Sequence, residues 1–146
     1  MAVDTVRMEV AREFLDRVRE LQRTIDSKGQ RIETLRDMAT STTGRMSDMP
    51  RSDSPDLQRM ETALCKAADL EIEIAEDLAA LEKAKEEITA AICELGDYRE
   101  QQVLFARYVE CQSWAAIACE CGYHYRTIMK QHRAGLAHLA AQMAEK

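Results

Sequence analysis

The chain has 146 residues, enough for one or two domains, and its formal net charge of −6 is unevenly spread. Residues 1–96 contain 14 basic and 21 acidic residues, whereas residues 97–146 contain 6 basic and 5 acidic residues. No apolar run approaches the roughly 18 to 20 residues of a membrane span, and the charged N-terminus lacks the apolar core of a signal peptide. We therefore expect a cytoplasmic protein without membrane contact. The five cysteines, an odd number, suit a reducing compartment better than a disulfide framework.

The first predicted element is a helix from about Val3 to Met38. Its apolar residues follow alternating steps of four and three, the a/d pattern of a coiled coil. The seam consists of Phe14, Val18, Leu21, Ile25, Lys28, Ile32 and Leu35. Lys28 and the following Gly29 weaken this seam, and a polar seam residue is more often a register device than a binding site.

Residues 39–53 break the pattern, because Ser, Thr, Gly and Pro dominate and the periodicity is lost. We expect a flexible loop at about 39–53. A loop of this length is unusual inside a compact unit. It is either a tolerated solvated connection or a recognition segment that orders on a partner.

A second helix is predicted from Pro55 to about Leu95, with Ser54 as its N-cap and Asp56 in its first turn. Its seam consists of Leu57, Met60, Leu64, Ala67, Leu70, Ile74, Leu78, Leu81, Lys85, Ile88, Ile92 and Leu95. An acidic belt accompanies it, formed by Glu71, Glu73, Glu76, Asp77, Glu82, Glu86 and Glu87. Such a belt is usually solvated, although it could also keep this half off DNA or bind a basic patch on another protein.

The two long helices are expected to pair as an antiparallel hairpin. Each would be roughly 55 Å long, and the loop between them spans at most about 50 Å, so a parallel pair within one chain is disfavoured. Apolar residues also lie outside the seam, at Ile72, Ala75 and Ala79. Because a two-helix core is narrow, we expect a homodimer built through the long helices.

Gly96 ends the second helix, and Asp97 can cap a third from Tyr98 to Val109. The segment from Ser113 to Arg133 then predicts two short helices joined by a tight turn. Ser113 is the expected N-cap of the first, and Gly122 ends it where a left-handed backbone is cheap. The small residue Ala118 lies four positions before Gly122, a spacing typical of a helix-turn-helix. The buried side of the second helix is expected to carry Tyr125, Ile128, Leu136 and Leu139.

The segment Tyr98 to Leu139, YREQQVLFARYVECQSWAAIACECGYHYRTIMKQHRAGLAHL, resembles the DNA-binding fourth region of sigma factors. It is more similar still to phage transcriptional regulators of the ArpU/RinA kind, from phages of Gram-positive bacteria. The resemblance covers the last third in detail and the remainder in layout only. His124 replaces the usual capping Ser or Thr, and Gln131 replaces a usual buried Leu or Ile. The resemblance implies control of phage genes in a bacterial host cell, at a promoter or on host RNA polymerase.

The residues we expect to contact duplex DNA are Ser113, His124, Tyr125, Arg126, Thr127, Lys130 and Arg133. Residues at the start of a recognition helix reach base edges in the major groove, and arginine suits bidentate contact to guanine. Ser113 and Arg133 suit phosphates. Tyr125 could either pack against Trp114 or bind a phosphate.

The other kinds of site have little support in the sequence. Zinc is disfavoured although Cys111, Cys119, Cys121, His124 and His132 are close in sequence, since Cys119 and Cys121 point apart on a helix and no C-x-x-C occurs. No catalytic motif is present, so we expect neither an enzyme nor a cofactor.

The prediction is an all-α protein with a helical hairpin over 1–96 and a helix-turn-helix DNA-binding domain over 97–146. Its expected function is regulation of phage or prophage transcription by sequence-specific DNA binding, as a dimer. One alternative is a phage packaging protein such as a small terminase subunit, for which rings rather than dimers are expected. Another is a protein-binding adaptor or anti-activator that uses the coiled coil.

Overall fold

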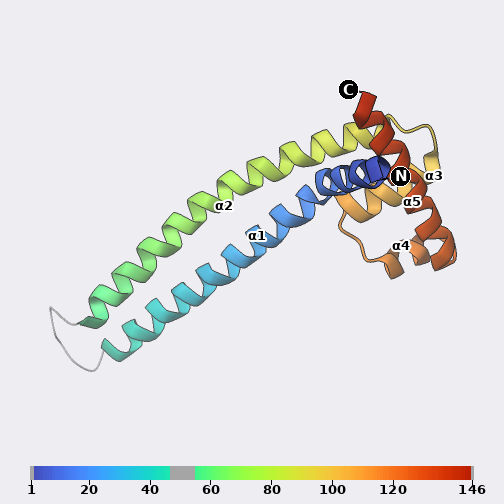
Figure 1. Cartoon of the computed structure of the whole chain (residues 1–146). Coiled ribbons are helices and arrows are strands. Elements are labelled where there is room, and N and C mark those ends of the chain that lie inside the picture. The colour runs from blue at the N-terminus through green and yellow to red at the C-terminus, as the bar shows by residue number, and fades with distance from the viewer. Residues whose placement is uncertain (1, 47–54, 146) are drawn as a thin grey trace. The chain divides into compact units, whose positions relative to one another are not determined.

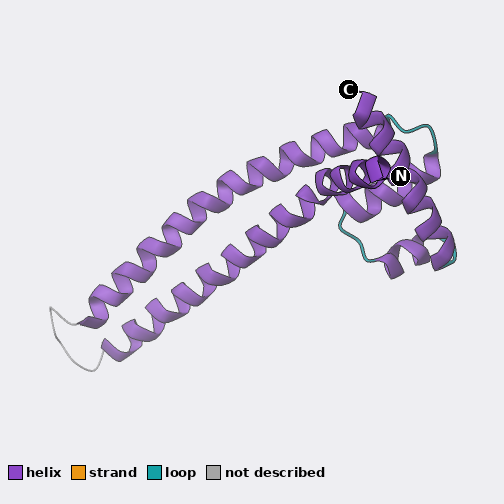
Figure 2. Ribbon diagram, in the orientation of Figure 1, coloured by secondary structure: helices purple, strands orange, loops and turns teal. Residues whose placement is uncertain are grey.

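The structure is a computed structural model that describes residues 2–46 and 55–145. Its helices are α1 (Ala2–Met46), α2 (Pro55–Cys93), α3 (Tyr98–Leu104), the π-helix η1 (Phe105–Val109), α4 (Trp114–Cys121) and α5 (Tyr125–Glu145) (Figure 1). The described residues contain no strand (Figure 2), so the all-α prediction with two long helices is confirmed. None of the described helices is long and apolar enough to cross a membrane.

By its contacts the chain divides into two compact units. The central unit comprises residues 21–80, and the terminal unit comprises residues 1–20 and 81–146. Parts of both long helices thus pack with the C-terminal helices α3, η1, α4 and α5, although we expected the boundary between Gly96 and Asp97. The assignment of residues 97–146 as a separate domain stays a prediction.

In the central unit, ion pairs between α1 and α2 show that the helices run antiparallel. Lys28 Nζ lies 2.7 Å from Asp77 Oδ2, and Arg36 pairs with Glu71. As residue numbers rise along α1, those of the partners on α2 fall. The small core between them contains Ile32, Ala67 and Leu70, with Leu35 and Ile74 packed against it.

Lys28, at its seam position on α1, forms an ion pair with the Asp77 carboxylate on α2. Both side chains are about one-fifth exposed. The hydrogen bond to Asp77 is the main cause that raises the pKa of Lys28. A polar pair at one position favours a single alignment of the two helices, as expected for a register device.

Helix α1 is longer than the sequence predicted, since it continues to Met46 through the first half of the expected loop at 39–53. Ala39 is buried, and Thr34 and Thr40 donate hydrogen bonds to the carbonyls four residues earlier, at Gln30 and Arg36. Threonines satisfied in this way are tolerated inside a helix. The rest of that loop and the Ser54 cap lie outside the described residues.

The predicted seam of α2 is wrong at two places, because Leu64 and Leu78 are 48% and 46% exposed. Ala63 is buried beside the former, and Ala84 is buried beside the seam position Lys85. A straight helix has 3.6 residues per turn, so a strict 3.5-residue seam drifts around its axis and the buried face moves to neighbouring positions. The predicted exposure of Ile72 is confirmed, at 62%.

In the terminal unit, the start of α1 and the end of α2 share a core with the C-terminal helices. Helix α1 buries Ala11, Leu15 and Val18 here, and Arg17 pairs with Glu87 on α2 at 2.9 Å. The end of α5 is also fixed in place: Leu139 and Ala140 are buried, and Gln142 donates a hydrogen bond to the Ala91 carbonyl.

Candidate nucleic-acid interface

Helix α3 begins where the sequence predicted. The Asp97 carboxylate accepts a hydrogen bond from the Arg99 backbone N–H at 2.8 Å and a longer one from Glu100. The predicted helix over 98–109 is α-helical only to Leu104 and then widens into the π-helix η1. In this wider turn the Glu110 N–H reaches the Phe105 carbonyl, five residues back. Such π-turns are frequent at functional sites.

Arg107 on η1 is held within the protein. Its guanidinium donates a hydrogen bond to the Gln112 carbonyl at 3.0 Å and lies over the Trp114 ring, 4.5 Å from the centroid. Burial is the main cause that lowers its pKa. Our sequence analysis did not foresee this arrangement, because it depends on how η1 and α4 meet.

A buried Tyr108–His132 pair joins η1 to α5. The Tyr108 hydroxyl lies 2.6 Å from His132 Nε2, and both side chains are almost fully buried. The Trp114 and His132 rings meet in a T-shaped arrangement, with their centroids 4.7 Å apart. Burial, followed by nearby arginine charges, lowers the pKa of His132 to about 4, so this imidazole is neutral at pH 7.

Helix α4 has the predicted boundaries and α5 begins where predicted, and each cap has a physical cause. Ser113 Oγ accepts a hydrogen bond from the Ala116 N–H at 3.1 Å, as the N-cap of α4. Gly122 ends α4 in the left-handed conformation, with φ of 70°, and its N–H bonds to the Ala118 carbonyl. Both caps could be predicted from the sequence, because a cap satisfies backbone groups only a few residues away.

His124 takes the place of the usual Ser or Thr before α5. Its Nδ1 accepts a hydrogen bond from the Arg126 N–H at 3.2 Å, and its carbonyl accepts the Ile128 N–H. The imidazole therefore caps the helix as a hydroxyl would. Since this bond occupies Nδ1, only Nε2 of His124 is left to meet a ligand.

The buried side of α5 is mostly as predicted, with Ile128, Leu136 and Leu139 fully buried. Tyr125 is not on that side, because it is 51% exposed and His132 and Arg107 make the ring contacts of Trp114. The prediction that Tyr125 lies on the buried side of the helix is therefore wrong.

The predicted contact residues mostly share one exposed surface. Ser113, His124, Tyr125, Arg126, Lys130 and Arg133 are exposed, and Thr127 is half-buried. Tyr125, Arg126, Lys130 and Arg133 line one shallow hollow on α5, together with Met129, which our sequence analysis missed. Ser113, His124 and Thr127 are not among its lining residues. No acidic residue lies between Cys121 and Ala144, so the hollow is uniformly positive.

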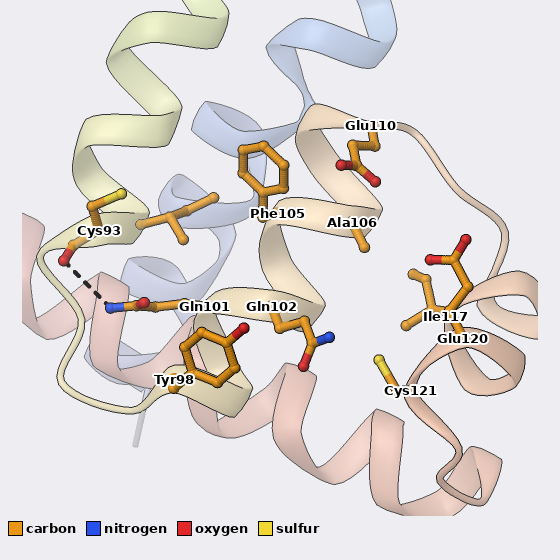
Figure 3. A pocket seen from close by; sticks show the side chains of 11 residues that line it. Cys93, Tyr98, Gln101, Gln102, Phe105, Ala106, Glu110, Ile117, Glu120 and Cys121 are labelled. Atoms are coloured by element: carbon orange, nitrogen blue, oxygen red, sulfur yellow. Dashed lines mark hydrogen bonds between the residues drawn. The ribbon is translucent and has the colours of Figure 1, made fainter.

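A second hollow in the terminal unit has a different character (Figure 3). It has a volume of about 340 Å³, and Phe105 and Ile117 are among its apolar lining residues. Its charged lining residues are Glu110 and Glu120, without any lysine or arginine. An acidic rim repels phosphate, so this groove does not belong to a nucleic-acid interface.

The described residues contain no group of three or more His, Cys, Asp or Glu side chains that could hold a metal ion. His132 bonds to Tyr108, whereas our sequence analysis had weighed it as a zinc ligand. Comparisons with protein-family models, curated proteins and solved structures find no match to this chain.

Proposed function

We propose that the protein binds duplex DNA through a helix-turn-helix made by α4 and α5, with α5 as the recognition helix. The observation that carries this proposal is the exposed positive face of α5. Arg126, Lys130 and Arg133 follow steps of four and three and emerge on one side. Ile128 and His132 fix the opposite side in the core. A helix anchored in this way can enter a major groove without unfolding.

The surrounding details support the same proposal. The turn at Gly122 is short, and the caps at Ser113 and His124 fix both helix starts. The first turn of α5 presents Tyr125 and Arg126, and residues at the N-terminal end of a recognition helix meet base edges. Arginine donates two parallel hydrogen bonds to guanine, and the nearby lysine is an ordinary phosphate contact.

By resemblance to phage regulators of the ArpU/RinA kind, we assign the DNA binding to control of phage or prophage transcription in a bacterial cytoplasm. Host RNA polymerase is a second partner that the resemblance implies. We further propose that the protein acts as a homodimer through the long helices, since α2 exposes Leu64, Ile72 and Leu78. A dimer presents two recognition helices, and two half-sites bind more tightly than one.

The exposed apolar face of α2 also favours a second candidate, a phage packaging protein of the small terminase type. Such a protein would use the long helices to assemble a ring around or beside DNA. Sedimentation of the full chain separates the two candidates, because a dimer supports transcription and a ring supports packaging. An adaptor or anti-activator would bind a protein instead of DNA.

The test of the proposed recognition helix compares Arg126→Ala with Lys83→Ala, an exposed lysine on α2 that serves as the matched loss of one charge. Binding is measured on the promoter-proximal DNA beside the protein's own gene and on unrelated duplex. Arg126→Ala is expected to lose about 1–3 kcal/mol on the selected site and to discriminate less between the two duplexes. Lys83→Ala should bind as the parent does.

Lys130→Ala tests the proposed phosphate contact, as Arg126→Ala tests the base contact. Loss of a phosphate contact should weaken binding to both duplexes equally, with a shallower salt dependence. If Arg126→Ala and Lys130→Ala both bind like the parent protein, α5 is not the recognition helix.

A further inference from the structure

The hollow that contains Glu110 and Glu120, called the acidic hollow below, has an apolar floor and charged edges (Figure 3). Residues from the end of α2, from α3, from η1 and from α4 line it, all within the terminal unit. Tyr98, Gln101 and Phe105 follow steps of three and four, so one face of α3 and η1 runs along the hollow.

The walls of the acidic hollow are fixed by the core of the terminal unit. Ile92 and Ile117 are 2% and 0% exposed, and Ala106 is also buried. Ile117 and Ala106 belong to the core cluster that includes Ile128 of α5, and Cys121 packs against this cluster. Side chains held in this way have little freedom to close the space between them, so the hollow is formed before a ligand arrives.

Both charged residues that line the acidic hollow are negative, and both are exposed: they are Glu110 and Glu120. The Gln101 side chain donates to the Cys93 carbonyl at 3.3 Å and to a second carbonyl, which leaves its own oxygen as an acceptor. Burial, followed by the charge of Glu120, raises the pKa of the Cys121 thiol. The hollow therefore favours a cation over an anion.

The two arginines on α3 and η1 do not occupy the acidic hollow. Arg107 donates to the Gln112 carbonyl and lies over the Trp114 ring. The guanidinium carbon of Arg99 lies 5.5 Å from the centroid of the Tyr123 ring. Neither arginine is among the residues that line the hollow. A cationic ligand would therefore meet the two carboxylates without displacing a positive side chain.

Two aromatic rings accompany the carboxylates. Tyr98 is 74% exposed, so its ring is accessible, and Phe105 is half-buried. The face of an aromatic ring attracts a cation, and proteins bind organic ammonium groups against such rings. The apolar floor beside them matches a hydrocarbon body. Charge and shape thus indicate the same class of ligand.

We propose that the acidic hollow binds a small organic amine in its ammonium form, with the charge beside Glu110 and Glu120 and the apolar body against Phe105 and Ile117. Its volume of about 340 Å³ lies in the range of small-molecule sites, roughly 300–1,000 Å³. The 11 lining residues are too few for a stable protein interface, which uses roughly 20–30 residues a side. This inference is independent of the proposed DNA binding.

The test uses three probes that share one apolar body and differ in charge: phenylbutylammonium, phenylbutanol and phenylbutyrate. Calorimetric titration of the full chain measures the affinity of each. The ammonium probe is expected to bind at least about fivefold more tightly than the alcohol, the combined effect of an exposed ion pair and a cation–π contact. The carboxylate should bind most weakly, because Glu110 and Glu120 repel it.

Cysteine labelling shows whether the probe binds in this hollow. Cys93 lines the hollow and is exposed, whereas Cys65 is exposed on α2 in the central unit. Saturating phenylbutylammonium should slow the reaction of Cys93 with iodoacetamide and leave that of Cys65 unchanged. Peptide mass spectrometry follows the two cysteines separately.

Three variants and a control test the assigned roles. Glu110→Gln and Glu120→Gln should each weaken binding of the ammonium probe by about two- to fivefold and leave that of the alcohol unchanged. Glu61→Gln is the matched control, since Glu61 is exposed on α2 in the central unit. Phe105→Leu keeps an apolar side chain but removes the ring, so it should reduce the preference for ammonium over alcohol. Circular dichroism melting checks that each variant is folded.

Several outcomes would overturn this inference while leaving the recognition helix untouched. Equal affinity for the ammonium probe and the alcohol would show that the carboxylates do not select a cation. Binding without protection of Cys93, or equal weakening by Glu61→Gln and Glu120→Gln, would place the probe elsewhere. If the ammonium probe does not bind at millimolar concentration, the acidic hollow is not a site for amines.

Discussion

His132 is the residue whose environment departs most from that of a free side chain. It is 3% exposed, bonds to Tyr108 through Nε2, and leaves Nδ1 buried without a partner among the described residues. Burial and the nearby arginines lower its pKa to about 4, whereas the ordinary value is 6.5. A buried imidazole that must stay neutral makes stability depend on pH.

The dependence has a definite sign. Between pH 6.5 and 4 the unfolded chain binds a proton at His132 and the folded chain does not, so the free energy of unfolding falls as pH falls. From this group we expect constant stability above about pH 6.5 and a loss of up to about 3 kcal/mol by pH 4. Denaturant unfolding at a series of pH values measures it.

Two variants isolate the contribution of His132. His132→Phe keeps a ring beside Trp114 but cannot be protonated, so its stability should change less than that of the parent protein between pH 6.5 and 4. Tyr108→Phe removes the hydrogen bond yet leaves the imidazole in place, so it should be less stable throughout and keep the parent slope. Equal slopes in the parent and His132→Phe would show that the imidazole is not the group that titrates.

Sequence reasoning at this scale succeeded where the cause was local. Asp97, Ser113 and Gly122 have the predicted capping roles, because each satisfies backbone groups within four residues. The Tyr108–His132 bond spans 24 positions and follows no periodicity, so nothing in the sequence pointed to it. His124 could have been assigned as a cap, since its imidazole nitrogen offers the acceptor that a hydroxyl would supply.

At the scale of elements, the terminal unit depends on the close approach of α5 to α3. A Cβ atom built on Gly135 would lie 3.0 Å from Leu104 Cδ1 and 3.4 Å from Glu100 Cβ. Leu104 is fully buried and Glu100 almost so, which leaves them little room to move. A side chain at this position would force Leu104 to shift by a few tenths of an ångström.

Gly135→Val is therefore expected to destabilise the protein by about 1–3 kcal/mol, the usual cost of overpacking. Gly29→Ala is the matched control, because Gly29 lies inside α1 with nothing within 4 Å of the added Cβ. There the gain in helix propensity should stabilise the protein by about 0.5–1 kcal/mol. Thermal or urea unfolding measures both, and unchanged stability of Gly135→Val would show that α3 and α5 are less tightly packed.

Periodicity predicted the existence of every described helix, and its failures are specific. Helix α1 extends past Met38 because Ala39 is buried and Thr40 satisfies a backbone carbonyl, features that outweigh the weak propensity of this segment. Leu15 was absent from the predicted seam, yet it is fully buried in the terminal unit. A single heptad pattern could not describe a helix that packs against several elements along its length.

At the scale of the whole molecule, the described residues divide into two compact units. The terminal unit contains the first part of α1 and the last part of α2 together with the C-terminal helices. The sequence placed a boundary at Gly96 because glycine interrupts the helical pattern there. Interrupted secondary structure does not require separate packing, and residues 1–20 and 81–96 contribute to the terminal core.

The central claim is that this protein binds duplex DNA through a positive surface centred on α5. It is tested most directly by a salt titration of the full chain on the promoter-proximal duplex beside its own gene. We predict selective binding whose logarithm falls linearly with the logarithm of salt concentration, with a slope of about 0.9 for each phosphate contacted. Absence of selective binding even at low salt would contradict the claim and make protein partners the next candidates.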